Sequence, residues 1–263
     1  MYNDLFTIGG VTVHGYGLMI AIGIIAAYTM ADYRAKMQGI NRDKLYILTI
    51  WAAVLGILGA KVLYLITMAP KIAEDPSLIL KDLASGFVVY GGIIGGLFGG
   101  IAVARVIGMP VLRTFDLCMP SIALAQGFGR IGCLLAGCCY GMEYSGPGAI
   151  VFSHSDFAPN GVSLFPSEPV YAVLNFAHCL ILLAAFRKLK NVPGRTGSLY
   201  LILYSIGRFM MEFVRGDAIR GSVGVLSTSQ FIAIFILILG AFAYAFAPKL
   251  AKFDLPLEEE PKM

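Results

Sequence analysis

Residues 226–247, LSTSQFIAIFILILGAFAYAFA, decide the fold, because they hold no charged side chain over a length that can cross a bilayer as a helix. A second run, residues 45–67, carries a single charged residue, Lys61. Of all 263 residues, 58% are apolar and only 14% are charged, against roughly 25% charged in soluble domains. The mean hydropathy of +0.78 also indicates a chain far more apolar than a soluble domain. The chain is therefore predicted to be an all-α polytopic membrane protein, and its five cysteines are too few for a disulfide-rich secreted scaffold.

Seven apolar segments are long enough to cross the bilayer. We predict transmembrane helices at residues 16–33, 45–67, 87–107, 115–139, 170–186, 198–214 and 226–247. These helices divide the chain into an N-terminal flap (1–15), helices 1–4 (16–139), a head (140–169), helices 5–7 (170–247) and a tail (248–263). Within the flap, apolar and polar residues alternate around Gly9-Gly10, which predicts a small hairpin.

The basic residues outside these helices are distributed unequally. Thirteen lie in the C-terminal tail and in the connections near residues 34–44, 105–113 and 187–195, whereas four lie in the remaining connections. Because lysine and arginine accumulate on the cytoplasmic side, we predict an external N-terminus and a cytoplasmic C-terminus. The segment 140–169, rich in proline and glycine, then forms a small irregular external head. Basic residues scattered at helix ends give no indication of nucleic-acid binding.

Two arginines lie inside predicted helices, where the bilayer penalises charge. An arginine at the centre of such a helix costs roughly 2.5–3.5 kcal/mol, so it is expected to face a cavity or a partner. Arg208 could pair with Glu212, four residues further on the same helix face, and Arg130 could extend to the outer interface. Alternatively, both guanidiniums converge on an anion. Within a bilayer the commonest anion is a phospholipid phosphate, which arginine binds through paired donors.

Glycines and tyrosines accompany these arginines. Two overlapping rows with small residues at every fourth position are formed by Gly91, Gly95 and Gly99 and by Gly92, Gly96 and Gly100. Close packing with another helix is sufficient to explain these rows. Tyr16, Tyr90 and Tyr204 suit either anchoring at the membrane interface or a role in phosphate binding and proton transfer.

Arg130 is followed by three cysteines, Cys133, Cys138 and Cys139. No two of them have the C-x-x-C spacing. A metal site, a disulfide and simple apolar packing are the alternatives for these residues. The sequence contains no G-x-S-x-G, H-E-x-x-H or P-loop motif, which disfavours an intramembrane serine protease or metalloprotease.

With these residues in place, the sequence resembles the bacterial prolipoprotein diacylglyceryl transferase family along most of its length. The resemblance is carried, in the family's order, by Tyr16-Gly17-Leu18-Met19, Tyr90-Gly91-Gly92-Ile93-Ile94-Gly95, Gly129-Arg130-Ile131-Gly132 with Gly137 and Gly141, Tyr204 through Arg215, and Ser229-Gln230. The chain departs from the family at several positions. Tyr90 replaces a histidine, Cys133 and Cys138 replace asparagine and glutamate, and Phe165 and Ala172 stand where a histidine and a glutamate are common.

The resemblance implies an enzyme of the bacterial inner membrane that acts in lipoprotein biosynthesis. It would transfer the diacylglyceryl group of phosphatidylglycerol to the lipobox cysteine thiol of a prolipoprotein signal peptide. No metal or diffusible cofactor is implied. The predicted catalytic residues are Arg130, Arg208 and Tyr90; the predicted substrate-binding residues are Arg130, Arg208, Tyr16, Gly91, Gly92, Gln126, Gly141, Tyr204, Glu212 and Arg215. Two alternatives are a lipid or small-anion transporter that uses the same arginines and a divergent family member with another donor or acceptor.

Overall fold

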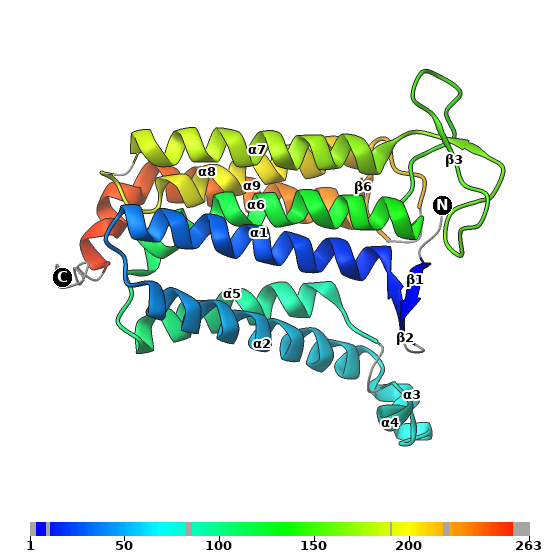
Figure 1. Cartoon of the computed structure of the whole chain (residues 1–263), viewed down its shortest axis with the longest axis horizontal. Helices are drawn as coiled ribbons and strands as arrows, with labels where there is room; N and C mark the ends of the chain where they lie inside the picture. The colour runs from blue at the N-terminus through cyan, green and yellow to red at the C-terminus, as the bar shows by residue number, and fades with distance from the viewer. Residues whose placement is uncertain (1–3, 9–10, 83–85, 190, 218–220, 255–263) are drawn as a thin grey trace. The chain divides into compact units, whose positions relative to one another are not determined.

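The computed structural model describes residues 4–8, 11–82, 86–189, 191–217 and 221–254. Most of their regular structure is helical (Figure 1), and the chain divides into two compact units. The large unit comprises residues 1–31 and 115–253, and the small unit comprises residues 32–114 and 254–263. Six helices in the described residues are long and apolar enough to cross a membrane. The chain is therefore a polytopic, helical membrane protein, as the sequence predicts.

Every predicted transmembrane segment falls on a long helix. These helices are α1 (Gly15–Met37), α2 (Arg42–Thr67), α5 (Val89–Val106), α6 (Val111–Ala136), α7 (Ser167–Leu189), α8 (Arg195–Glu212) and α9 (Thr228–Leu250). Only α8 is not among the six apolar candidates. It packs against both α7 and α9, and it buries polar residues, Thr196, Ser198, Ser205 and Arg208, that lower its hydropathy.

Short elements complete the chain. The helical ones are α3 (Ala69–Glu74), α4 (Leu78–Lys81) and η2 (Ala251–Phe253), and the strands are β1 (Asp4–Ile8), β2 (Val11–His14), β3 (Ile150–Val151), β4 (Ser163–Leu164), β5 (Ser222–Val223) and β6 (Leu226–Ser227). The strands form three antiparallel pairs, β1 with β2, β3 with β4 and β5 with β6. The predicted N-terminal hairpin is therefore present, although Gly9 and Gly10 at its turn lie outside the described residues.

The core of the large unit lies between α6, α7 and α8. Met119 and Ala123 from α6, Cys179 and Leu182 from α7, and Tyr200 from α8 are buried together. The N-terminus of α8 is also fixed to α6 by one carboxylate. The two oxygens of Asp116 accept hydrogen bonds from the backbone N–H groups of Gly194 and Gly197, each at 2.7 Å. Because Gly194 has no side chain to cap its own helix, α6 supplies the cap and sets where α8 begins.

The segment between α6 and α7, predicted as an irregular head, has a small core of its own. Phe152, Ala158 and Leu164 are buried there, against partly buried neighbours such as Tyr140. The backbone also joins this segment to the residues that follow α8. The N–H of Met142 donates to the carbonyl of Val214 at 2.9 Å, and the N–H of Gly216 donates to that of Tyr140 at 3.0 Å. The ends of α6 and α8 are thereby held next to each other.

In the small unit, α2 and α5 approach so closely that their glycines touch backbone to backbone. A Cβ atom added to Gly91 would collide with the carbonyl oxygen of Gly59, and one added to Gly95 would collide with that of Leu55. In the adjacent row, a Cβ on Gly92 would lie 3.4 Å from the carbonyl oxygen of Gly56. The interpretation of both glycine rows as a packing surface is therefore confirmed, and their partner is α2.

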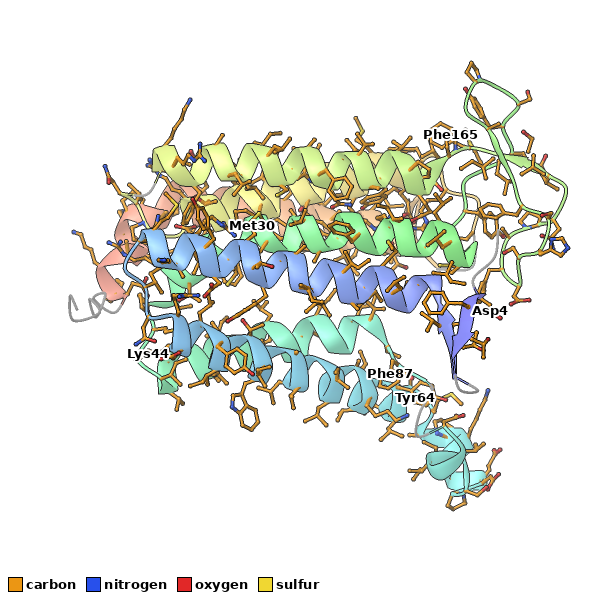
Figure 2. All side chains as sticks on the ribbon, in the orientation of Figure 1. Asp4, Met30, Lys44, Tyr64, Phe87 and Phe165 are labelled. Carbon is orange, nitrogen blue, oxygen red and sulfur yellow. The ribbon has the colours of Figure 1, made fainter. Side chains whose placement is uncertain are left out.

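The one basic residue predicted within the second span, Lys61, is stabilised by polar and aromatic contacts inside the small unit. The ammonium group of Lys61 donates to the backbone carbonyl of Asp82. It also lies 5.2 Å from the ring centroid of Tyr64 and 5.1 Å from that of Phe87, two residues labelled at one end of this unit in Figure 2. Cation–π contacts of this kind reduce the penalty of a charge in an apolar environment.

The glycine contact predicts different effects for two alanine substitutions in the same helix. In Gly95→Ala the new methyl group meets the backbone of α2, which cannot move aside, so we expect a loss of about 1–3 kcal/mol in the free energy of unfolding. In Gly100→Ala the new methyl group lies 3.7 Å from the Cβ of Ala52, an ordinary contact. Unfolding of the purified protein in detergent measures both, and equal stability of the two variants would contradict the prediction.

Candidate active site

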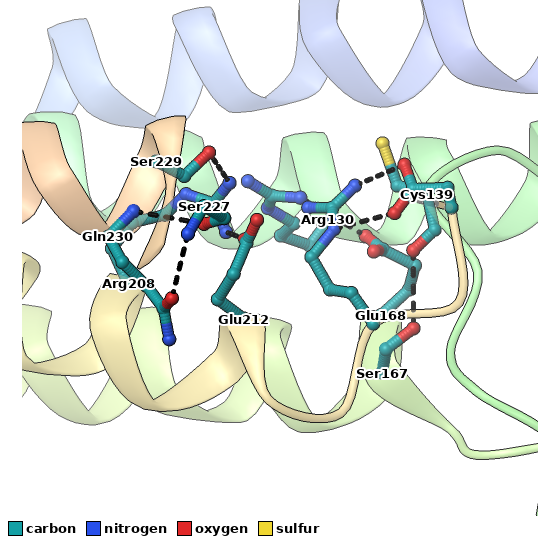
Figure 3. A network of polar contacts seen from close by, with 11 residues as sticks. Arg130, Cys139, Ser167, Glu168, Arg208, Glu212, Ser227, Ser229 and Gln230 are labelled. Atoms are coloured by element: carbon teal, nitrogen blue, oxygen red, sulfur yellow. Dashed lines mark hydrogen bonds and ion pairs between the residues drawn. The ribbon is translucent and has the colours of Figure 1, made fainter. Parts of the chain in front are cut away.

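Arg208 projects from α8 and is buried in the large unit, only 8% exposed. Its Nη2 donates to the hydroxyl of Ser229 at 2.5 Å, and its Nη1 lies 2.6 Å from the carboxylate of Glu212, one helical turn further along (Figure 3). The predicted pair between Arg208 and Glu212 is therefore present. Ser229 lies in the first turn of α9, which the capping box of Ser227 and Gln230 fixes in place.

Arg130 projects from α6 toward the first turns of α7. Its guanidinium stacks over the ring of Tyr171 at 4.1 Å from the centroid, and its Nη1 lies 3.5 Å from the carboxylate of Glu168. Glu168 and Tyr171 are three residues apart, so they share one face of α7. The side chain of Arg130 is 23% exposed. Arg130 is therefore held between two helices, and whether it also reaches the membrane interface stays a prediction.

A third guanidinium, Arg215, follows the end of α8. It donates two hydrogen bonds to the carboxylate of Asp217, at 2.7 and 2.5 Å. Burial opposes its charge, but the Asp217 carboxylate outweighs that effect and raises the pKa of Arg215 above its usual value. Arg215 also pairs with Gly141 in an isolated antiparallel bridge, which places it beside the loop that leaves α6. The Cys139 thiol in this loop is a further neighbour of the Arg215 guanidinium.

Buried polar atoms near these arginines fall into two groups. Nη1 of Arg208 and Oε2 of Glu212 face each other in their ion pair at 2.6 Å, and Oε2 of Glu168 lies 3.5 Å from Arg130. The hydroxyl of Tyr171 and Oε1 of Gln126 have no hydrogen-bond partner within the described residues. Gln126 uses its other amide atom, Nε2, to donate to Tyr200 at 2.9 Å. A buried donor or acceptor that stays unpaired is unfavourable by about 1–3 kcal/mol. Such atoms beside guanidiniums are therefore expected where a polar ligand binds.

The large unit brings most of the predicted site residues together. Tyr16 lies against α6, where a Cβ on Gly132 would approach its ring to 3.2 Å. Tyr204 stacks on Tyr200 at a centroid distance of 5.9 Å. Gly141 is packed so tightly against the backbone of Phe165 that a side chain would not fit. Each of these contacts involves an element that also carries, or borders, one of the arginines.

Tyr90, Gly91 and Gly92 belong to the small unit. Gly91 and Gly92 contact α2, so their small size is already explained by helix packing. Tyr90 is 48% exposed, which suits an aromatic residue near a membrane interface. Their role in a site remains a prediction.

Sequence reasoning missed three residues that complete the network: Glu168, Tyr171 and Asp217. Glu168 and Tyr171 could have been identified from their spacing, because an acidic residue and a tyrosine three positions apart open an otherwise apolar helix. Asp217 lies only two residues beyond Arg215, yet no helical periodicity links the two. Cys139 was among the cysteines noted in the sequence, but its position beside Arg215 depends on the loop conformation.

Together, the helical fold and the buried guanidiniums define a multi-pass membrane protein with a site suited to an anion. A family model described as prolipoprotein diacylglyceryl transferase matches residues 3–246. The chain is 49% identical over 235 residues to a Clostridium perfringens protein named phosphatidylglycerol–prolipoprotein diacylglyceryl transferase 2, a match covering 89% of this chain and 91% of that protein. The phosphatidylglycerol–prolipoprotein diacylglyceryl transferase of Clostridium tetani is 45% identical over 240 residues, covering 91% of this chain and 95% of the relative.

A more distant relative with the same name, from Finegoldia magna, is 31% identical over 235 residues and matches 89% of this chain. The chain belongs to the prolipoprotein diacylglyceryl transferase family. The resemblance found in the sequence motifs is thereby confirmed, and the chain is placed among transferases.

The pair of Arg130 with Glu168 yields a prediction about stability. Glu168→Gln leaves the partly buried guanidinium of Arg130 without its counter-charge, and we expect a loss of about 3 kcal/mol in the free energy of unfolding. Glu143→Gln removes an exposed carboxylate and is expected to change stability by less than about 0.5 kcal/mol. Chemical denaturation in detergent compares the variants. If Glu168→Gln is as stable as the unmodified protein, the ion pair does not stabilise the fold.

Proposed function

We propose that this chain transfers the diacylglyceryl group of phosphatidylglycerol to the lipobox cysteine thiol of a prolipoprotein. The named relatives support this reaction, since they share up to 49% of their residues with the chain over most of its length. The observation that carries the proposal is the placement of Arg130 and Arg208 inside the large unit, Arg208 buried and Arg130 partly buried. A phosphate group offers a guanidinium paired acceptor oxygens.

In the proposed reaction, the acceptor sulfur forms a bond to the terminal glyceryl carbon of the lipid. The bond between that carbon and the phosphate oxygen breaks, and its electron pair stays on the oxygen. Glycerol phosphate leaves, and the thiol proton passes to solvent or to the leaving group. Negative charge therefore develops on the phosphate at the moment of bond breaking. Donors already fixed in a dry site stabilise this charge without reorganisation.

Arg208 is the group best prepared for this role. Ser229 holds its guanidinium through Nη2 and Glu212 through Nη1, so the group is fixed in a single orientation. Arg130 approaches the phosphate as a second cation, positioned by the ring of Tyr171. Arg215, restrained by Asp217, contributes positive potential where the loop leaves α6. A guanidinium close to an acceptor cysteine also favours the thiolate form of that cysteine.

Tyr16, Gln126, Tyr204 and Gly141 are proposed to shape the surroundings of the lipid headgroup. Gln126 has an acceptor oxygen that a glycerol hydroxyl of phosphatidylglycerol would satisfy. Tyr90, with Gly91 and Gly92, is proposed to orient the lipid or the incoming thiol. This role is supported by the motif that the three residues form, rather than by a contact.

Removal of either arginine tests the phosphate site. Arg208→Ala is expected to slow transfer by roughly 10²–10³-fold, the range for losing a preorganised donor to a developing oxyanion. Arg130→Ala is expected to lower it to a similar degree. Mass spectrometry of a lipobox peptide incubated with purified protein and phosphatidylglycerol detects the diacylglyceryl increment on cysteine.

Arg187→Ala, which removes an exposed guanidinium near the end of α7, is the matched control and should retain activity. Full activity of the folded Arg208→Ala protein would overturn the role of Arg208. Movement of lipid across vesicles without any covalent product would favour the transporter alternative instead.

We also propose that the chain lies in the inner membrane of a bacterium and that α8 is its seventh transmembrane helix, covered by α7 and α9. The distribution of basic residues supports an external N-terminus, an external head at 140–169 and a cytoplasmic tail. Alkaline phosphatase, which is active only outside the cytoplasm, tests this topology when fused after residue 158 or after residue 39. We expect activity for the first fusion alone; activity for only the second would reverse the orientation.

A further inference from the structure

Three cysteine thiols gather at the end of α6. The sulfur atoms of Cys133, Cys138 and Cys139 all lie within 4.8 Å of one another. All three residues are half-buried, and none of them forms a disulfide within the described residues. The mechanism above uses none of these thiols. Three sulfur atoms this close together can all bind one soft metal ion. A disulfide, in contrast, would use two of the sulfur atoms and leave the third unbonded.

The helix end itself brings the first two thiols together. Gly137 adopts a left-handed conformation, with φ of 71°, immediately after the last helical residue, Ala136. The N–H of Cys138 donates to the carbonyl of Cys133 at 3.1 Å, and the N–H of Gly137 donates to that of Leu134 at 3.2 Å. These two bonds define a Schellman motif, which places the side chains five residues apart in contact. That contact is usually apolar, and here both of its members are thiols.

A second unusual backbone conformation brings the third thiol in. Cys139 has φ of 60° and is the only non-glycine residue in the described ranges with a positive value. Such a conformation is unfavourable by roughly 1–2 kcal/mol for a side chain other than glycine. It is held by the hydroxyl of Ser167, which donates to the carbonyl of Cys139 at 3.2 Å (Figure 3). The fold therefore maintains a disfavoured conformation that turns adjacent cysteines toward the same point.

The charges nearby suit a thiolate complex. Three thiolates around a divalent ion carry a net charge of −1, which needs compensation inside a protein. The guanidinium of Arg130 lies one helical turn before Cys133 and interacts electrostatically with Cys133 and Cys139. Arg215 lies beside Cys139. Two cations are thus already in place, and soft thiolate ligands select ions such as zinc or copper(I).

We propose that Cys133, Cys138 and Cys139 bind a thiophilic divalent ion of the zinc type, and that the acceptor cysteine thiol occupies its fourth coordination position. Among the described residues, no histidine, carboxylate or further cysteine joins this group as a fourth ligand. Three protein ligands with one open position are the arrangement of a catalytic zinc site, whereas structural sites are closed by four. The part of this inference that concerns the acceptor thiol rests on the proposed function.

The ion would supply the nucleophile. A thiol that coordinates zinc is deprotonated, so the acceptor S–H releases its proton to solvent when the metal–sulfur bond forms. The coordinated sulfur then forms its bond to the glyceryl carbon, and the phosphate departs with the electron pair of the broken carbon–oxygen bond. The metal is neither oxidised nor reduced. The thioether product is a weaker ligand than a thiolate, so it leaves the ion. This route does not require the histidine that Tyr90 replaces.

Metal binding is tested first, independently of transfer activity. Cd²⁺ serves as the probe, because cadmium thiolates have a charge-transfer absorption in the ultraviolet. The full-length protein, reduced and purified in detergent, should bind one Cd²⁺ per chain with this absorption. Each of Cys133→Ser, Cys138→Ser and Cys139→Ser should weaken binding by at least tenfold, on the scale of losing part of a metal site. Cys118→Ser, a matched thiol removal in the same helix, should bind like the unmodified protein.

A lipobox peptide then tests the open position. Adding the peptide to the Cd²⁺-loaded protein should change the charge-transfer absorption, and the same peptide with serine in place of cysteine should not. With Zn²⁺ as the ion, metal-stripped protein should transfer the lipid roughly 10²-fold more slowly, the scale expected for losing activation of the nucleophile.

The outcomes separate this inference from the proposed function. The metal site would be overturned if protein in which Cys133, Cys138 and Cys139 are all reduced binds no Cd²⁺. A disulfide between two of these three cysteines in the native protein would also overturn it. Undiminished transfer by metal-free protein would overturn the role of the ion and leave the proposed function intact. Loaded, folded protein that transfers no lipid would overturn the proposed function, while the metal site would stand.

Discussion

The burial of the Arg208 guanidinium is the constraint on which the architecture of the large unit depends. A charge removed from water is tolerated only when counter-charges and hydrogen bonds surround it, and here Glu212 and Ser229 provide them. These groups lie on α8 and α9, so both helices must meet at this point. The same requirement explains why α8 is the least apolar of the long helices. A helix carrying such a residue must be covered by its neighbours, and α7 and α9 pack against it.

The local part of this arrangement is predictable from the sequence, whereas the long-range part is not. The pair of Arg208 and Glu212 follows from a spacing of four residues in a helix, and apolar runs indicate where the long helices lie. Arg130 and Glu168 are separated by a loop and a small core around Phe152. Their contact depends on how α7 docks on α6, which no periodicity specifies. The sequence therefore left the partner of Arg130 open.

The glycine rows illustrate the same division within the small unit. The repeat at every fourth residue indicates a surface for close helix contact, and the contact exists. The repeat does not specify which helix packs there. In the structure, the carbonyl oxygens of Gly59 and Leu55 on α2 lie against that surface. The cysteines are the extreme case, because their spacing matches no metal motif. Only the left-handed turns at Gly137 and Cys139 direct three thiols to one point.

These features become connected on α6, which carries Arg130 and, one turn later, Cys133. Displacement of a phosphate by a thiol needs stabilisation of the leaving group and preparation of the nucleophile, two tasks that require opposite charges. In the proposed mechanism, guanidiniums would stabilise the departing phosphate, whereas a thiolate-bound ion would deliver the sulfur as an anion. A rigid helix that holds Arg130 and Cys133 fixes their separation, which a loop could not do. An acceptor cysteine bound at the thiol cluster would therefore be activated beside the cation proposed to bind the lipid phosphate.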